Sequence, residues 1–229
     1  MDQSYAQYLL KKTIENYNLI AEDFSRTRRY VWPGFEFLAQ YAKPNDNVLD
    51  LGCGNGRLLD LLRDKKINYI GIDNSSALIA AAQKRHPGAD FRVGDALNLP
   101  FSDNYFDIIY SIAVLHHIPS EELRTKFLEE AKRVLKPGGI LIITVWNLWQ
   151  RRGLKYNLKY AVLKVLGLSK LDFRDVFVPW AKTRQRYFHC FSQKELKRLV
   201  ESVGFNVGEI DILESAEKKG NNIYLVAQK

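Results

Sequence analysis

The feature that most constrains this 229-residue chain is a glycine loop that directly follows a short apolar run. Residues 47–51 have the composition of a short buried strand, and they lead into Gly52-Cys53-Gly54-Asn55-Gly56. Glycines at alternate positions let the backbone turn tightly and bring its N–H groups against a ligand. The pattern therefore predicts a strand, a ligand-binding loop and a helix in succession.

Apolar runs and helical patterns continue to alternate up to residue 147. Strands separated by helices of this length predict a Rossmann-like α/β fold, a mostly parallel sheet with helices on both faces. The expected strands cover residues 47–51, 68–73, 90–94, 106–112 and 140–145, and the expected helices cover residues 57–66, 76–86 and 121–135.

Further elements are predicted on both sides of this core. Residues 5–24 and 33–42 have the pattern of two helices laid across the top of the sheet. Ser192 and Glu195 form a capping-box pattern at the start of a helix over 192–203, and residues 205–213 and 222–227 indicate a final antiparallel hairpin. We expect one domain with four parts: N-terminal helices (1–44), a core with the glycine loop (45–147), a basic insertion or cap (148–190), and a C-terminal helix and hairpin (191–229).

Charge is unevenly distributed along the chain. The net charge is +8, whereas residues 151–200 alone hold 13 Lys or Arg and three acids, which leaves a local balance of +10. Such a basic block favours a polyanionic partner, nucleic acid or an acidic membrane, and a solvated basic face without a partner is the alternative.

Two further properties of the sequence concern compartment and redox chemistry. The N-terminal residues have no targeting pattern, and no run approaches the roughly 20 apolar residues that cross a bilayer, so we expect a soluble cytoplasmic protein. Cys53 and Cys190 have no nearby Cys or His ligand set. We therefore predict no metal, and both cysteines are expected to be reduced, unreactive thiols.

Three carboxylates accompany the ends of the predicted strands. Asp50 precedes the glycine loop, where it can reach a ligand ammonium group directly or through water and would repel the phosphates of a dinucleotide. Asp73 ends the second strand, 17 residues after Gly56, where it can accept hydrogen bonds from ribose hydroxyls. Asp95 follows the third strand, where it can face an adenine amino group. Each of them alone could be a turn former, but the loop spacing also differs from the Gly-x-Gly-x-x-Gly of dinucleotide binders.

Five motifs of the core carry a family resemblance, and they are Val48-Leu49-Asp50-Leu51-Gly52-Cys53-Gly54-Asn55-Gly56, Gly71-Ile72-Asp73, Gly94-Asp95-Ala96, Phe106-Asp107-Ile108-Ile109 and Leu135-Lys136-Pro137-Gly138-Gly139. Together they resemble the class I S-adenosylmethionine-dependent methyltransferases. The resemblance implies a seven-stranded sheet with one antiparallel strand and S-adenosylmethionine as the methyl donor, with no metal. It places Asp73 on the ribose, Asp95 near adenine and the glycine loop beside the methionine. The cofactor-binding residues expected on this basis are Asp50, Gly52, Cys53, Gly54, Asn55, Gly56, Asp73, Asn74, Asp95, Ala96, Leu97, Ser111, Ile112 and Ala113.

Three further groups of residues bear on the methyl acceptor. They are Ile20-Ala21-Glu22-Asp23-Phe24-Ser25-Arg26-Thr27-Arg28 with Trp32-Pro33, Ser111-Ile112-Ala113-Val114-Leu115-His116-His117, and Val178-Pro179-Trp180 with Arg186-Tyr187-Phe188-His189-Cys190-Phe191. They resemble the eukaryotic-type tRNA methyltransferases that esterify 5-carboxymethyluridine at the wobble position. The resemblance implies tRNA as the partner and a small activator subunit as a second candidate partner. No Asn/Asp-Pro-Pro-Tyr motif follows the fourth strand, which argues against amino-group methylation of adenine or glutamine.

A carboxylate acceptor is ionised at neutral pH, so it needs no strong general base. Catalysis can then depend on holding the carboxylate in line with the methyl group. Arg28 is the candidate for this grip, because a guanidinium meets a carboxylate in a bidentate geometry; an ordinary surface arginine is the alternative. His116 is the second catalytic candidate, with a structural role as the alternative. The expected substrate-binding residues, whose aromatic members could stack on bases, are Trp32, His117, Trp180, Arg186 and Tyr187.

Two rival functions stay open at this point. The same core resembles quinone-biosynthesis and sterol methyltransferases, which act on small or lipid-like molecules. Residues 154–166 support that alternative, because their apolar residues recur at helical spacing with lysines between them. Such a helix can lie on an anionic membrane, or it can cap the substrate site with its apolar stripe. A non-catalytic binding module is the third possibility, and it would need a decayed cofactor site.

Overall fold

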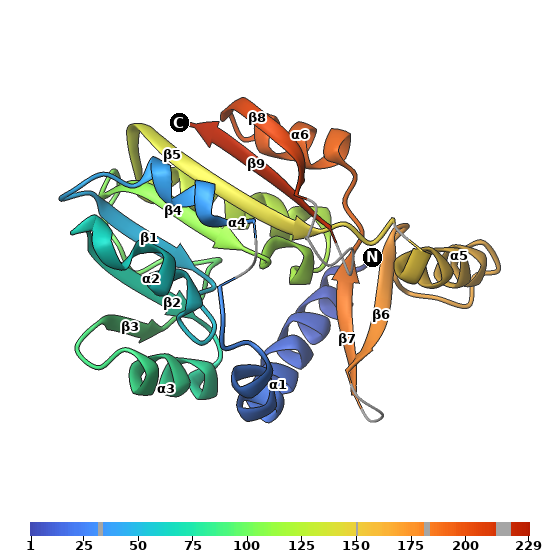
Figure 1. Cartoon of the computed structure of the whole chain (residues 1–229). Helices are drawn as coiled ribbons and strands as arrows, with labels where there is room; N and C mark the ends of the chain where they lie inside the picture. The colour runs from blue at the N-terminus through green and yellow to red at the C-terminus, as the bar shows by residue number, and fades with distance from the viewer. Residues whose placement is uncertain (32–33, 150, 181–183, 214–220) are drawn as a thin grey trace.

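The computed structural model describes residues 1–31, 34–149, 151–180, 184–213 and 221–229, with only the backbone at Arg151, Arg152, Trp180 and Arg184. Its core is a seven-stranded sheet with the strand order β3-β2-β1-β4-β5-β9-β8 (Figure 1). Five strands are parallel to one another, and they are β1 (Asn47–Leu51), β2 (Asn68–Asp73), β3 (Asp90–Val93), β4 (Phe106–Ile112) and β5 (Leu135–Trp146).

The remaining two strands of the sheet form the C-terminal hairpin. β9 (Asn222–Gln228) lies antiparallel between β5 and β8 (Asn206–Leu213). The predicted α/β class, a seven-stranded, mostly parallel sheet that ends in an antiparallel strand, is therefore confirmed.

Helices cover both faces of the sheet. α4 (Glu121–Val134) and α6 (Gln193–Ser202) pack on one face, and α2 (Arg57–Leu62) packs on the other with the 3-10 helix η1 (Glu36–Tyr41). Each face of the sheet packs with its helices in a separate hydrophobic cluster. Successive side chains of a strand point to opposite faces, so neighbouring residues belong to different clusters. Thus Leu49 joins the α4 cluster, whereas Val48 joins the α2 cluster.

Most predicted boundaries agree with the structure to within a few residues. The predicted helix over 57–66 is α2 followed by the 3-10 helix η2 (Arg63–Lys65), and α3 spans Ser76–Arg85. The largest difference in the core is at β5, which begins at Leu135 because Leu135 pairs with Phe106. Gly139 permits this, since a side chain there would approach the carbonyl oxygen of Lys136 to 2.9 Å.

The N-terminal region forms one long helix, α1 (Gln3–Thr27), and the helix predicted over 33–42 is the shorter η1. Figure 1 shows α1 between α3 and the strand β7. The side-chain oxygen of Asn18 accepts hydrogen bonds from the Ser75 hydroxyl (2.8 Å) and from the Ala77 N–H (3.2 Å). These two bonds tie α1 to the beginning of α3.

The basic insertion holds a helix that the apolar spacing of residues 154–166 predicted and a hairpin that was not predicted. α5 spans Arg151–Val165, and β6 (Asp175–Trp180) pairs with β7 (Arg184–His189) in an antiparallel hairpin outside the main sheet. In β7 an apolar pair, Tyr187 and Phe188, interrupts any polar–apolar alternation, so the strand has no simple period of two. In the described part of the chain, no helix is long and apolar enough to cross a membrane.

Candidate active site

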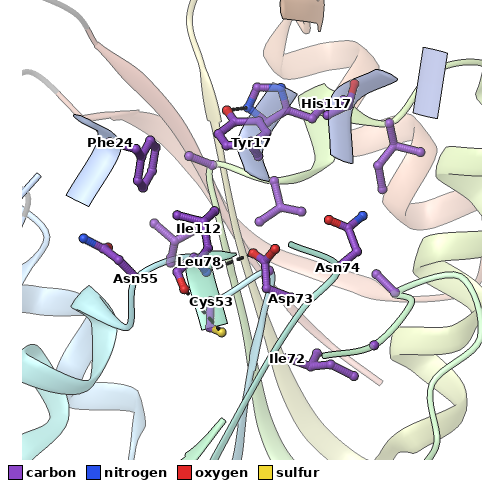
Figure 2. Close-up of a pocket in the computed structure, with 18 of the residues that line it drawn as sticks. Tyr17, Phe24, Cys53, Asn55, Ile72, Asp73, Asn74, Leu78, Ile112 and His117 are labelled. Atoms are coloured by element: carbon purple, nitrogen blue, oxygen red, sulfur yellow. Dashed lines mark hydrogen bonds between the residues drawn. The ribbon is translucent and has the colours of Figure 1, made fainter. Parts of the chain in front are cut away.

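The carboxyl ends of the first four strands open into a cavity of about 1120 Å³, a volume that includes its mouth. The cavity lies where the strand order reverses between β1 and β4, which is where open α/β sheets place their ligands. α1 and β7 close its other side, because Tyr17 and Phe24 (Figure 2) and also Arg186 contribute to the lining.

The glycine loop forms the floor of the cavity. Gly52 and Gly54 have positive φ angles of 82° and 54°. A side chain at Gly52 would lie 2.4 Å from Val114, whereas one at Gly54 would project into open space with only Phe24 nearby, at 3.8 Å. The loop is tied to α1, since the Asn55 side chain donates to the backbone oxygen of Arg28 at 3.1 Å. Glycine at position 54 therefore leaves room for a ligand against the backbone.

Asp73 is the carboxylate at the centre of the cavity wall. It accepts hydrogen bonds from the N–H groups of Gly54 (2.9 Å; Figure 2) and Ser75 (2.8 Å), and burial raises its pKa. An ionised carboxylate can accept about four hydrogen bonds, so two positions remain for ligand hydroxyls. Asp95 is more exposed and accepts from the N–H of Leu97 at 2.9 Å.

The predicted cofactor set surrounds this cavity except at three positions. Asp50, Gly56 and Ser111 do not line it, whereas the other predicted cofactor residues do. Asp50 is 2% exposed and accepts a hydrogen bond from the Tyr69 hydroxyl at 2.7 Å, and burial raises its pKa to about 7. Because its side chain points to β2, a direct contact between Asp50 and a ligand ammonium group does not fit this geometry, and the contact through water stays a prediction.

Positive charge also contributes to the lining of the cavity. Arg28, Arg57 and Arg186 all line it. The Arg28 guanidinium lies 4.6 Å from the centre of the Phe24 ring, and burial together with the charge of Arg186 lowers the pKa of Arg28. Burial lowers the pKa of Arg57 to about 9. The cavity lining therefore combines the carboxylate of Asp73 with three guanidinium groups.

A directed chain of hydrogen bonds supports Arg186. Burial and the charge of Arg186 lower the pKa of His117 to about 3, so this ring is neutral. Its Nδ1 lies 3.2 Å from the carbonyl oxygen of Tyr187, which can only accept, so Nδ1 carries the proton. Nε2 then accepts from the Tyr17 hydroxyl at 2.8 Å (Figure 2), and the Tyr17 oxygen accepts from Arg186 at 3.2 Å.

The remaining catalytic and substrate candidates are placed differently. His116 is fully buried and does not line the cavity; its Nδ1 accepts from the Trp146 N–H at 3.3 Å, and its ring stacks on Phe188. This is the environment of a packing residue, which was the structural alternative for His116. Tyr187 is also buried behind the lining. Trp32 and the side chain of Trp180 lie outside the described residues.

Several lining residues were absent from the sequence-based prediction. On α1 they share one helix face, since Leu10, Thr13, Tyr17 and Phe24 are spaced by three, four and seven residues. That spacing is visible in the sequence, but it does not predict which part of the protein this helix face packs against. Trp146, the last residue of β5, also lines the cavity and was not predicted.

The insertion helix does not act as the expected cap. None of the described side chains of α5 lines the cavity, and Leu154, Leu158 and Val162 on its apolar stripe are exposed. Among the described residues, no group of three His, Cys, Asp or Glu is arranged to hold a metal ion.

Comparison with known proteins places this site in a family. A family model described as a methyltransferase domain matches residues 49–143. The tRNA (carboxymethyluridine(34)-5-O)-methyltransferase of Schizosaccharomyces pombe is 30% identical over 216 residues, which cover 84% of this chain and 88% of that protein. The enzyme of the same name from Arabidopsis thaliana is 42% identical over 130 residues, 57% of this chain and 31% of that protein.

The solved structures agree with this assignment. A SAM-dependent methyltransferase from Methanosarcina mazei superposes with a TM-score of 0.73 at 27% identity, and the match covers 87% of this chain and 98% of that one. The chain spans about a third of the length of several curated relatives that it matches, the Arabidopsis enzyme among them. The chain belongs to the family of S-adenosylmethionine-dependent methyltransferases that includes the tRNA (carboxymethyluridine(34)-5-O)-methyltransferases.

Proposed function

We propose that this chain methylates the carboxylate of a carboxymethyl-modified wobble uridine in tRNA, with S-adenosylmethionine as the methyl donor. The names of the relatives support the reaction class and the substrate. The observation that carries the proposal is the pair of guanidinium groups, Arg28 and Arg186, that line one cavity with Asp73. Their mutual repulsion lowers the pKa of Arg28 in addition to burial, and an anion placed between them would relieve it.

The described residues fit the proposed cofactor. Asp73 would accept hydrogen bonds from the ribose hydroxyls, and the open space before Gly54 would admit the methionine part against the loop backbone. Asp95 would face the adenine, beside Ala96 and Leu97, which also line the cavity. When bound, S-adenosylmethionine supplies an electrophilic methyl group.

The chain's own residues would then orient the acceptor. Arg28 and Arg186 would hold the acceptor carboxylate, and the hydrogen-bonded Tyr17 and His117 would fix the direction of Arg186. A carboxylate is already ionised at neutral pH, so no proton has to be removed from it. His117 suits this reaction, because a ring whose pKa is about 3 is a poor proton acceptor at neutral pH. Catalysis would therefore come mainly from positioning and desolvation.

The proposal is tested by incubating the protein with labelled S-adenosylmethionine and separate RNA, lipid and protein fractions. We expect label in tRNA, and nucleoside analysis should find it as the methyl ester of 5-carboxymethyluridine. The matched control is a transcript of the same tRNA with unmodified uridine at the wobble position, which should take up no label. Label in the lipid fraction instead would contradict this proposal and indicate that the methyl acceptor is a lipid-like molecule. The family resemblance also predicts a small activator subunit. The assay is therefore run both with the chain alone and with any small protein that co-purifies with it.

Arg28→Lys tests the proposed grip on the acceptor. Lysine keeps the charge but loses the bidentate geometry, so we expect kcat/KM for tRNA to fall about tenfold to a hundredfold, the effect of about 1.4–2.8 kcal/mol. Calorimetry should give a dissociation constant for S-adenosylmethionine near that of the wild type. Arg28 lies beside Asn55 of the glycine loop, so the opposite result, weak cofactor binding, would assign Arg28 to the carboxylate of the cofactor.

A further inference from the structure

α5 presents an apolar stripe to the outside of the molecule. Leu154, Leu158, Val162 and Val165 recur every three or four residues and so lie on one face of the helix. All four are exposed, Leu158 by 65% and Val165 by 75%. The stripe continues past the end of the helix, where Leu166 and Leu168 are exposed by 63% and 71%. Figure 1 shows α5 beyond the β6–β7 hairpin, away from the main sheet.

The opposite face of the same helix already attaches it to the protein. Tyr156 and Tyr160 pack in a cluster with Val176 of β6, and the Asn157 amide donates to the backbone oxygen of Leu148 at 3.0 Å. Helices of soluble proteins usually have one apolar face, and that face is buried against the core. α5 has a second one, which the fold of the chain does not bury.

Positive charge accompanies the stripe in the sequence and on the helix surface. Residues 151–170 contain six Lys or Arg and no Asp or Glu. Lys155 and Lys159 are exposed next to the stripe, with their ammonium groups 5.0 and 5.4 Å from the ring centres of Tyr156 and Tyr160. The outer surface of α5 therefore combines large aliphatic side chains with positive charge only.

We propose that α5 docks the protein on an anionic lipid surface, with its aliphatic stripe between the headgroups and its lysines on the lipid phosphates. A helix of 15 residues is about 22 Å long and can lie in the plane of the interface. RNA offers phosphates but no apolar surface for six aliphatic side chains. A second copy of the chain would bring lysines against lysines, so charge disfavours pairing through this face. The proposal does not use the cofactor cavity and stands apart from the methylation of tRNA.

The test is flotation of the full chain with vesicles of phosphatidylcholine, with and without phosphatidylserine. We expect the protein to float only with the vesicles that contain phosphatidylserine, and to be released by high salt. Leu158→Ser combined with Val162→Ser should lower the partition coefficient about tenfold or more, since both apolar contacts are lost. Lys155→Glu combined with Lys159→Glu should abolish the preference for anionic vesicles.

Matched controls lie elsewhere on the surface. Leu19→Ser removes an aliphatic side chain of α1 that is 62% exposed, and Lys84→Glu with Lys126→Glu makes the same charge change on α3 and α4. Neither control should alter flotation, and S-adenosylmethionine binding should show that every variant is folded. The proposal is overturned if the wild type does not float at low salt, or if the stripe variant floats like the wild type. It is also overturned if the stripe variant changes only tRNA binding, or only the oligomeric state seen by light scattering.

Discussion

At the scale of single residues, the hydroxyl group of Tyr17 connects two sides of the cavity. It donates to the neutral ring of His117 and accepts from Arg186, so its proton and one lone pair are committed. Arg186 is 4% exposed and also lies over the rings of Trp146 and Phe188. One phenol oxygen therefore helps to orient a buried guanidinium that lines the cavity.

Tyr17→Phe should lower kcat/KM for tRNA about tenfold and leave the dissociation constant of S-adenosylmethionine within about twofold of the wild type. The physical reason is that loss of the hydroxyl removes a partner from two buried polar groups, which costs about 1–3 kcal/mol. Steady-state kinetics and calorimetry measure the two quantities. Tyr8→Phe is the control, because Tyr8 is a 52% exposed tyrosine on the same helix. An unchanged kcat/KM in the Tyr17 variant would show that Tyr17 does not position Arg186 for the reaction.

Substitution of Asp73 should mainly affect cofactor binding, whereas substitution of His116 should mainly affect stability. Asp73→Ala removes a carboxylate that lines the cavity, so S-adenosylmethionine should bind about a hundredfold more weakly if two ribose contacts are lost. His116→Ala leaves a hole between Phe188 and Trp146, so it should mainly lower the melting temperature. Calorimetry and thermal unfolding of both variants separate these effects. If His116→Ala weakened cofactor binding more than Asp73→Ala did, the cofactor site would have to be assigned differently.

At the scale of elements, an ionic cluster fastens the β6–β7 hairpin to α6. His189 of β7 contacts Asp175 at 2.7 Å and Glu195 at 3.0 Å, and Glu195 also pairs with Arg174. Glu195 closes the capping box of α6 with Ser192 as well. The hairpin carries Arg186, so this cluster helps to hold one wall of the cavity.

The charge of Glu195 should make the stability of this attachment depend on pH. Burial raises the pKa of Glu195, but the hydrogen bond and charge of His189 and those of Arg174 outweigh it and lower the pKa to about 2. A carboxyl whose pKa is lower in the folded state stabilises that state above its unfolded pKa of about 4.3, and the contribution disappears as the pH falls toward 2. Glu195→Gln, which keeps a capping-box residue, should therefore be less stable than the wild type at neutral pH.

The difference between the two proteins should shrink as the pH is lowered from about 7 toward about 3. Urea unfolding at several pH values measures it as the free energy of unfolding. Glu201→Gln on the same helix is the control, because its pair with Lys197 is exposed and should contribute little. A gap between wild type and Glu195→Gln that stayed constant over this range would argue against an ionic contribution of Glu195.

The elements also differ in how far the sequence could predict them. β1, β2 and β4 have the predicted bounds, because parallel strands of such a sheet are short apolar runs; β1 is followed by Gly52 and β2 ends at Asp73. β6 and β7 were not predicted, since their pairing is stabilised by contacts with α5, α6 and His117 and not by an internal pattern. In α5, the apolar stripe was visible in the sequence, but its exposure was not.

At the scale of the whole molecule, the surplus of positive charge in residues 151–200 should govern binding to tRNA. If about five phosphates are contacted, affinity should fall on the order of a hundredfold between about 50 and about 200 mM salt, because counterions are released. Filter binding of tRNA over a salt series measures this dependence. An affinity that did not respond to salt would show that the basic insertion does not contact the phosphate backbone.

The sequence by itself determined the class of fold, the glycine loop and the position of Asp73, because these depend on contacts between residues that are close along the chain. Local backbone geometry and the period of apolar residues are sufficient to fix them. Only the tertiary structure decided that Tyr17 of α1, His117 after β4 and Arg186 of β7 meet at one cavity. It also decided that Asp50 and His116 lie behind the lining, and that the stripe of α5 faces outward. The physical reason is that helical spacing defines a face, whereas the packing of distant elements determines what that face meets.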